Sequence, residues 1–278
     1  MALFNYKLKS VIDCGFPKTR NGHKSVSWFW LTDSNYYLDL GDVRLFECSA
    51  KYIGKHHLAS AFDDYYYIRQ LEDLFDILPN IANAIPADLF SFIDTAEKRE
   101  VLRKTCDELA DMSEGRPDEI DVIHEFLDYA QLDTGYLSAR SECQFFHIGE
   151  RLIIQYDFRA QDDDGVPVWS ATAGQLEMPY ERFVDEIGNL LTRFFHDMDR
   201  QIEEAIEQLA GEVFYDVLLS RDEKKGITSS GVDYLRKEHA ERKAYFFDVF
   251  HQLKNNELNN SLDWERVRTV MQTATAQN

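Results

Sequence analysis

The sequence predicts an α+β protein in which mostly antiparallel β-sheets are covered by helices. Two observations lead to this fold class. Aromatic and β-branched residues gather in two stretches, about 24–49 and 135–178, and each stretch is followed by a helical pattern. From about 179 to 218 the apolar residues recur every three or four positions, a spacing that a strand cannot produce. We therefore expect two β-meanders, one long amphipathic helix and a C-terminal pair of helices.

The first β-meander is expected to contain three strands. They are Val26–Leu31, Tyr36–Leu40 and Val43–Cys48, which are rich in aromatic and branched side chains. Thr-Asp-Ser-Asn and Gly-Asp separate them, and Asn and Gly are common in hairpin turns because they tolerate positive φ. Alternation along the first strand would place Trp28 and Trp30 on the same face.

Three helices are predicted between the two meanders. Apolar side chains follow the helical period over 58–79, and Pro79 is expected to end this helix. Two shorter helices are expected over about 95–112, with Thr95 as the N-cap, and over about 117–129.

The second β-meander contains the strongest hairpin signal of the chain. Its strands are expected at Gln144–Ile148 and Leu152–Phe158, joined by a Gly-Glu turn. Two further strands, Val166–Ala171 and Gln175–Met178, should complete the sheet. Between the hairpin and these strands, Asp162–Asp164 form an acidic tip.

The long helix that follows should cover the second meander with its apolar face. That face carries Phe183, Ile187, Leu190, Phe194, Met198, Ile202, Ile206, Leu209 and Val213. The opposite face is rich in Asp and Glu. After a polar linker, the C-terminal helices are expected over about 232–254 and 262–273.

The chain is expected to fold as a core domain with a helical extension. The core would span 1–220 and consist of two β-then-helix halves, 1–130 and 131–220. The extension, 221–278, would pack on this core.

The charge of the chain limits its partners. The formal net charge is −20; residues 58–160 carry 22 acidic and 9 basic side chains, and residues 161–220 carry 14 and 3. Such a surface disfavours direct binding to nucleic acids or anionic membranes, because both attract positive charge. It suits either plain solubility or the binding of a basic protein partner.

We expect a cytoplasmic protein. The N-terminus lacks the basic and apolar regions of a signal peptide, and no run of 18 apolar residues occurs. Cys14, Cys48, Cys106 and Cys143 are widely spaced and form no CxxC pair, so free buried thiols are predicted.

No motif indicates catalysis, a metal or a cofactor. The chain has no Glu-x-x-His pair, no nucleophile-elbow serine and no glycine-rich phosphate loop. We therefore predict no catalytic residue, no metal ligand and no cofactor. The alternative is an enzyme whose site is assembled from distant residues. A deep polar pocket that held Asp133, Tyr136 and His147 together would favour it.

The candidate partner-binding residues are aromatic and acidic. They are Trp28, Trp30, Tyr136, Trp169, Asp33, Asp133, Asp162, Asp163 and Asp164. In this hypothesis the aromatic residues form a groove with Asp33 and Asp133 at its rim, and Asp162–Asp164 mimic an acidic substrate. The plainer interpretation is that the aromatic residues pack in the core and the three Asp form a solvated tip.

Two segments resemble the signature of a bacterial family of unknown function. SWFWLTDSNYYLDLG is similar to WFxLTxGxYxxxxG, although Ser34-Asn35 stand where that family tends to have Gly. LDTGYL, GVPVWSATAG and the segment around MDRQI resemble the second half, although Gln201 splits an Arg-Ile pair. The likeness covers about 25–50 and 131–202. It implies a link to bacterial defence or toxin–immunity loci.

These observations favour a non-enzymatic binding protein. We expect an acidic immunity protein that neutralises a cognate toxin by occluding its active or substrate-binding surface. The alternatives are a hydrolase-like enzyme with a cleft between the two β-rich regions, and a structural subunit of a defence complex.

Overall fold

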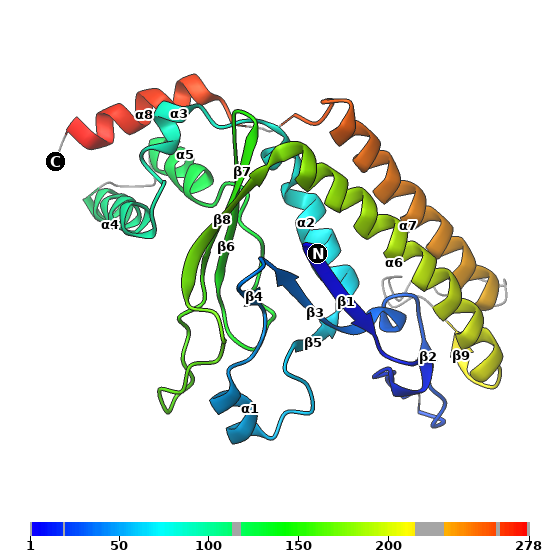
Figure 1. The fold of residues 1–278 in the computed structure, drawn as a ribbon. Coiled ribbons are helices and arrows are strands. Elements are labelled where there is room, and N and C mark those ends of the chain that lie inside the picture. The colour runs from blue at the N-terminus through cyan, green and yellow to red at the C-terminus, as the bar shows by residue number, and fades with distance from the viewer. Residues whose placement is uncertain (1, 19, 113–117, 215–230, 260–261, 277–278) are drawn as a thin grey trace.

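Strands and helices of the protein form an α+β fold (Figure 1). The computed structural model describes residues 2–276 except 19, 113–117, 215–230 and 260–261. The strands are β1 (Phe4–Leu8), β2 (Ser25–Val26), β3 (Asp33–Asp39), β4 (Arg44–Leu45), β5 (Asp63–Tyr66), β6 (Glu142–Ile148), β7 (Arg151–Asp157), β8 (Ala173–Pro179) and β9 (Val213–Phe214). The helices are α1 (Ala50–His56), α2 (Tyr67–Ala82), α3 (Ala87–Phe90), α4 (Ala96–Met112), α5 (Asp118–Leu127), α6 (Tyr180–Gln208), α7 (Gly231–Lys254) and α8 (Trp264–Ala276).

The larger sheets are both antiparallel. In the N-terminal sheet β3 lies in the middle, with β1 on one side and β4 and β5 on the other. In the second sheet the order is β6-β7-β8. The predicted hairpin turns at Gly41 and Gly149 are confirmed, and both glycines have the positive φ that such turns require. A short parallel pair joins β2, which follows β1, to β9, which follows α6.

Helices cover both faces of the second sheet. Phe145 and Phe146 are neighbours on β6, so their side chains point to opposite faces. Phe145 contacts Phe183 of α6, with ring centroids 5.9 Å apart, and Phe146 contacts Phe90 of α3 at 5.4 Å. The prediction that the long helix covers this sheet is confirmed at its N-terminal end.

The apolar face of α6 extends well beyond the second sheet. Of the nine residues predicted for this face, seven are buried: Phe183, Ile187, Leu190, Phe194, Met198, Ile202 and Leu209. Ile206 is half-buried, and Val213 is 40% exposed because it lies in β9 rather than in the helix. Phe194 packs against Trp28, Tyr6 and Tyr67, which belong to the N-terminal half. The helix therefore joins both sheets in one core. It ends at Gln208 rather than near 218, because Gly211 and β9 follow.

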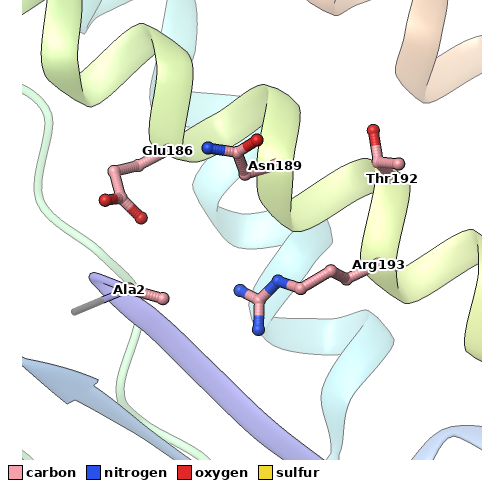
Figure 2. A pocket seen from close by; sticks show the side chains of 5 residues that line it. All are labelled: Ala2, Glu186, Asn189, Thr192 and Arg193. Atoms are coloured by element: carbon pink, nitrogen blue, oxygen red, sulfur yellow. The ribbon is translucent and has the colours of Figure 1, made fainter.

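Side chains of α6 also hold the edge strand β1. Figure 2 shows Glu186 and Arg193 reaching from α6 toward the chain at Ala2. Glu186 accepts a hydrogen bond from Leu3 N–H at 2.9 Å, and Arg193 donates one to the Phe4 carbonyl at 2.7 Å. The shallow pocket between them, about 420 Å³, is thus lined by side chains that serve the fold.

The C-terminal helical pair is confirmed, and α7 lies alongside α6 (Figure 1). A chain of polar contacts fixes it there. The Trp28 indole N–H donates to His239 Nδ1 at 3.0 Å, and His239 Nε2 lies 2.7 Å from Asp199. Lys243 donates to the same carboxylate at 3.0 Å, and the Arg242 guanidinium lies 4.7 Å from the Trp28 ring. The last helix, α8, packs on α5.

The first meander differs from its prediction. Of the first expected strand, Val26–Leu31, only Val26 is β-structure, as part of β2, and a 3₁₀ turn follows at Trp30–Thr32. Trp28 and Leu31 are fully buried while Trp30 is half-buried, a three-residue spacing that a turn satisfies and a strand does not. The expected Asp-Ser-Asn turn is instead part of β3, where its residues pair with β1 and β5.

Two further predicted elements are corrected. The helix expected over 58–79 begins only at Tyr67, because 63–66 pair with β3 as β5, and Pro79 lies within its last turn. Val166–Ala171 is not a strand of the second sheet. It makes a bridge between Trp169 and Cys48 and so connects the two halves.

Candidate functional site

Five aromatic side chains form a continuous, partly exposed patch, which we call the aromatic surface. It consists of Phe29, Trp30, Tyr65, Tyr66 and Tyr136. The Tyr66 ring lies 4.5 Å from Phe29 and 4.8 Å from Trp30. The Tyr65 ring lies 5.2 Å from Tyr66 and 4.8 Å from Tyr136, on which it stacks.

Three segments that are distant in sequence position this surface. Phe29 and Trp30 come from the 3₁₀ turn after β2, and Tyr65 and Tyr66 come from β5. Tyr136 comes from the loop before β6, where Asp133 accepts a hydrogen bond from Gly135 N–H at 2.8 Å and closes a tight turn. The pairing of β5 with β3 brings the first two segments together.

Asp33 lies under one end of the aromatic surface in an ion-pair cluster. Its carboxylate is 3.1 Å from Lys9 Nζ and accepts a hydrogen bond from Gly15 N–H at 3.1 Å. Lys9 also pairs with the exposed Asp64 at 2.7 Å. Burial raises the pKa of Asp33, and burial together with the Asp33 charge raises the pKa of Tyr66 to about 12. Asp33 is thus a buried support for the surface.

Asp73 of α2 lies under the other end. Burial raises the pKa of its carboxyl to about 6, although the Tyr136 hydroxyl and the Arg69 guanidinium lower it. The Tyr136 hydroxyl is buried beside Asp73 without the alignment of a hydrogen bond, and its pKa is raised by burial and by that charge. Arg69 lies over the Tyr136 ring, 5.9 Å from its centre. The polar end of Tyr136 therefore points inward.

A pocket of about 480 Å³ adjoins the Lys9 cluster. Its charged and polar lining includes Lys9, Asp13, Asn35 and Asp64, and Leu58 and Phe62 supply apolar walls. Asn35 carries a buried amide nitrogen without a hydrogen-bond partner.

The structure assembles four of the predicted binding residues and separates the others. Trp30 and Tyr136 lie in the aromatic surface, Asp33 beneath it, and Asp133 in the exposed turn beside Tyr136. Trp28 and Trp169 do not belong to it. They are only 0% and 2% exposed and pack in the core, as the plainer interpretation has it.

Asp162, Asp163 and Asp164 lie in a separate turn beside α1. Lys55 Nζ lies 2.6 Å from Asp162 and 2.5 Å from Asp164, so two of the three charges are paired within the chain. The hydrogen bond from Lys55 lowers the pKa of Asp162. Asp163 is exposed. The tip is therefore braced by α1, which the sequence pattern did not indicate.

Three members of the aromatic surface were missed from the sequence: Phe29, Tyr65 and Tyr66. A signal for Tyr65 and Tyr66 was present in the run Asp63-Asp64-Tyr65-Tyr66-Tyr67. Its three consecutive aromatic residues do not follow the three- or four-residue spacing of an amphipathic helix. Because the run was assigned to a helix, its aromatic residues were expected to face the core.

The residues proposed for an assembled catalytic site are not brought together. Tyr136 lies beside Asp73, whereas His147 contacts the Ile81 carbonyl, two helical turns further along α2. His147 also stacks on Tyr180 at 3.7 Å. Cys14, Cys48, Cys106 and Cys143 are free and buried, as predicted. Within the described residues there is no cluster of three or more metal-ligating side chains.

The fold and the site define an α+β protein with a partly exposed aromatic surface that has carboxylates around and beneath it. Within the described segments no helix is long and apolar enough to cross a membrane. The chain belongs to the family of unknown function DUF5984, whose sequence model matches residues 3–270. No curated protein and no solved structure matches it.

Proposed function

We propose that this protein binds a basic protein partner through the aromatic surface. In this proposal it is an immunity protein, which neutralises a toxin by covering the toxin's active or substrate-binding surface. The single observation that carries the proposal is the contiguous set of partly exposed aromatic rings from three separate segments. Neighbouring aromatic side chains that remain partly exposed are enriched at protein interfaces.

The construction of the surface suits tight binding. Tyr and Trp supply most hot-spot energy in protein interfaces, because they bury a large area with few rotatable bonds. Here the Trp30 indole N–H and the Tyr136 hydroxyl are buried. The rings therefore offer apolar edges to a partner, and their neighbours within the surface hold them in place before binding.

The charge around the surface favours a basic partner. Asp64 and Asp133 are exposed at its margins, and Asp13 lines the neighbouring pocket together with Asp64. The net charge of −20 adds a long-range attraction for a basic protein. A Lys or Arg side chain from that protein would fit the pocket of about 480 Å³.

The test is binding to basic proteins encoded beside this chain. Calorimetry would measure each one against the wild-type protein and against Trp30→Ala and Tyr65→Ala. We expect each variant to weaken binding about 10- to 30-fold, the usual effect of a hot-spot residue. Tyr245→Ala is the matched control. Tyr245 is 56% exposed on α7 and is not part of the aromatic surface, so its loss should leave the affinity unchanged.

A cellular assay separates immunity from simple binding. Co-expression with the toxic neighbour should restore growth for the wild-type protein and Tyr245→Ala, but not for Trp30→Ala. Thermal melts confirm that each variant is folded. If no neighbouring protein binds, or if the aromatic variants protect cells as well as the wild type, the proposal is wrong.

A further inference from the structure

The outer edge of β8 presents unpaired backbone groups. Phe158 N–H donates to the Thr172 carbonyl, and Tyr180 N–H donates to the Glu150 carbonyl. These two bonds fix the register in which the even-numbered residues of β8 bond to β7. The N–H and C=O groups of Ala173, Gln175 and Glu177 therefore point away from β7, toward the free edge.

At the opposite edge of this sheet, the outward backbone groups of β6 are bonded to other segments of the chain. Phe145 N–H donates to the Ala130 carbonyl, and Leu132 N–H donates to the Cys143 carbonyl. The His147 carbonyl accepts from Ile85 N–H. Beside β8, by contrast, the described residues place no further strand.

The sequence of β8 leaves this edge open to another strand. Natural edge strands are usually protected by Lys, by a bulge or by an interrupting Pro. β8 has no Lys, and its only Pro is Pro179, whose position points outward at the very end of the strand. The one charged side chain, Glu177, is paired with Arg151 at 2.8 Å. The Tyr156 side chain lies over Gly174 and packs where this strand has no side chain of its own.

We propose that β8 is a second binding site, at which an extended, basic segment of a partner protein adds as a fourth strand. Backbone hydrogen bonds to Gln175 and Glu177 supply the contact. The charge of the chain selects the occupant. A second copy would bring another −20 to the same edge, whereas a Lys- or Arg-bearing strand is attracted to it. This site does not depend on what binds the aromatic surface.

The probe is a nine-residue synthetic peptide of alternating Lys and Val, added to the full-length protein. Residue-specific amide exchange by NMR is the readout. We expect the amides of Gln175 and Glu177 to become protected at least 10-fold, and those of Gly174, Leu176 and Met178, which already bond to β7, to stay unchanged. The same peptide with alternate amides N-methylated keeps its charge but should bind at least 10-fold more weakly.

Two protein variants complete the test. Gln175→Pro removes one outward N–H without touching a bond to β7, and should weaken the peptide at least 5-fold. Gln175→Ala keeps that N–H and should bind like the wild type, and melting curves establish that both variants are folded. Equal binding of the N-methylated peptide, protection elsewhere in the chain, or no binding would overturn the proposal. Light scattering that showed dimers lost in Gln175→Pro would also overturn it, in favour of a second copy.

Discussion

At the scale of single residues, Asp73 shows how the protein holds a carboxylate under the aromatic surface. The carboxyl is buried between α2 and the loop of Tyr136, and it pairs with the half-exposed Arg69, 3.7 Å away. Burial outweighs this pairing and raises the pKa of Asp73 to about 6. A raised carboxyl pKa means that the folded state binds the proton more tightly than the unfolded chain. The stability that the protonated Asp73 carboxyl contributes is therefore fully present below about pH 4, and it is lost as the pH rises through about 6.

Asp73→Asn should remove the cost of burying the ionised Asp73 carboxylate at neutral pH. We expect the free energy of unfolding at pH 7 to rise by about 1–3 kcal/mol, because two units of pKa correspond to about 3 kcal/mol and the contact with Arg69 is lost. The gain should shrink toward zero near pH 4. Urea melts between pH 4 and 7.5 measure it. Asp76→Asn, an exposed neighbour on α2, is the control, and an equal effect there would contradict this account.

At the scale of elements, α6 is the part of the fold that the sequence specified best. Nine apolar residues spaced three or four apart predicted its buried stripe, and seven of them are buried. Its C-terminal end was predicted about ten residues too late, because periodicity alone does not register Gly211 or the pairing of β9 with β2. Local pattern fixes which face of a helix is buried, but distant pairing fixes where the helix stops.

Phe194→Ala tests the packing of this helix. Phe194 is fully buried among Trp28, Tyr6, Tyr67 and Phe195, so the substitution leaves a cavity at the junction of both sheets. The free energy of unfolding should fall by about 3–5 kcal/mol. Thr192→Ala, on the exposed face, should change it by less than about 0.5 kcal/mol. A change below about 1 kcal/mol for Phe194→Ala in denaturant melts would show that the stripe is not packed as described.

The candidate site was harder to predict than the elements. Trp30, Asp33, Asp133 and Tyr136 lie near one another in the structure, but Asp33 is buried beneath the aromatic surface rather than at its rim. Tyr65 and Tyr66 were not predicted, because β5 pairs with β3 across about thirty residues of sequence and no local signal marks that pairing. Trp28 and Trp169 differ from Trp30 only in burial, which composition does not reveal.

At the scale of the whole molecule, the contacts of His239 join three distant parts of the chain. Trp28 can only donate, so His239 Nδ1 accepts, and the proton of the neutral ring lies on Nε2 facing Asp199. Lys243 and Asp199 flank the ring, and Arg242 with Glu238 and Glu72 lie beyond it. Burial lowers the pKa of His239, although Asp199 raises it. Protonation of Nδ1 would break the bond to Trp28.

This arrangement predicts acid sensitivity of the entire fold. A lowered His pKa means that the unfolded chain binds the proton first, so the stability is complete above about pH 6.5 and declines as the pH falls through the folded-state pKa. His239→Gln can keep both hydrogen bonds without titrating. As the pH is lowered from 7 to 5, the urea midpoint of His239→Gln minus that of the wild type should increase, because only the wild type loses stability. A constant difference between the two proteins across that range would refute the role of His239.

The hydrogen bonds from α6 to the backbone of β1 and the residue before it have a consequence for synthesis on the ribosome. The backbone groups of Leu3 and Phe4 meet Glu186 and Arg193, about 183 and 189 positions later in the chain. At about 5–20 residues per second, the first strand waits roughly 10–40 s before those partners are made. During that interval its edge stays exposed. The backbone groups of Leu3 and Phe4 thus complete these two contacts only after α6 has been synthesised, although β1 can pair with β3 much earlier.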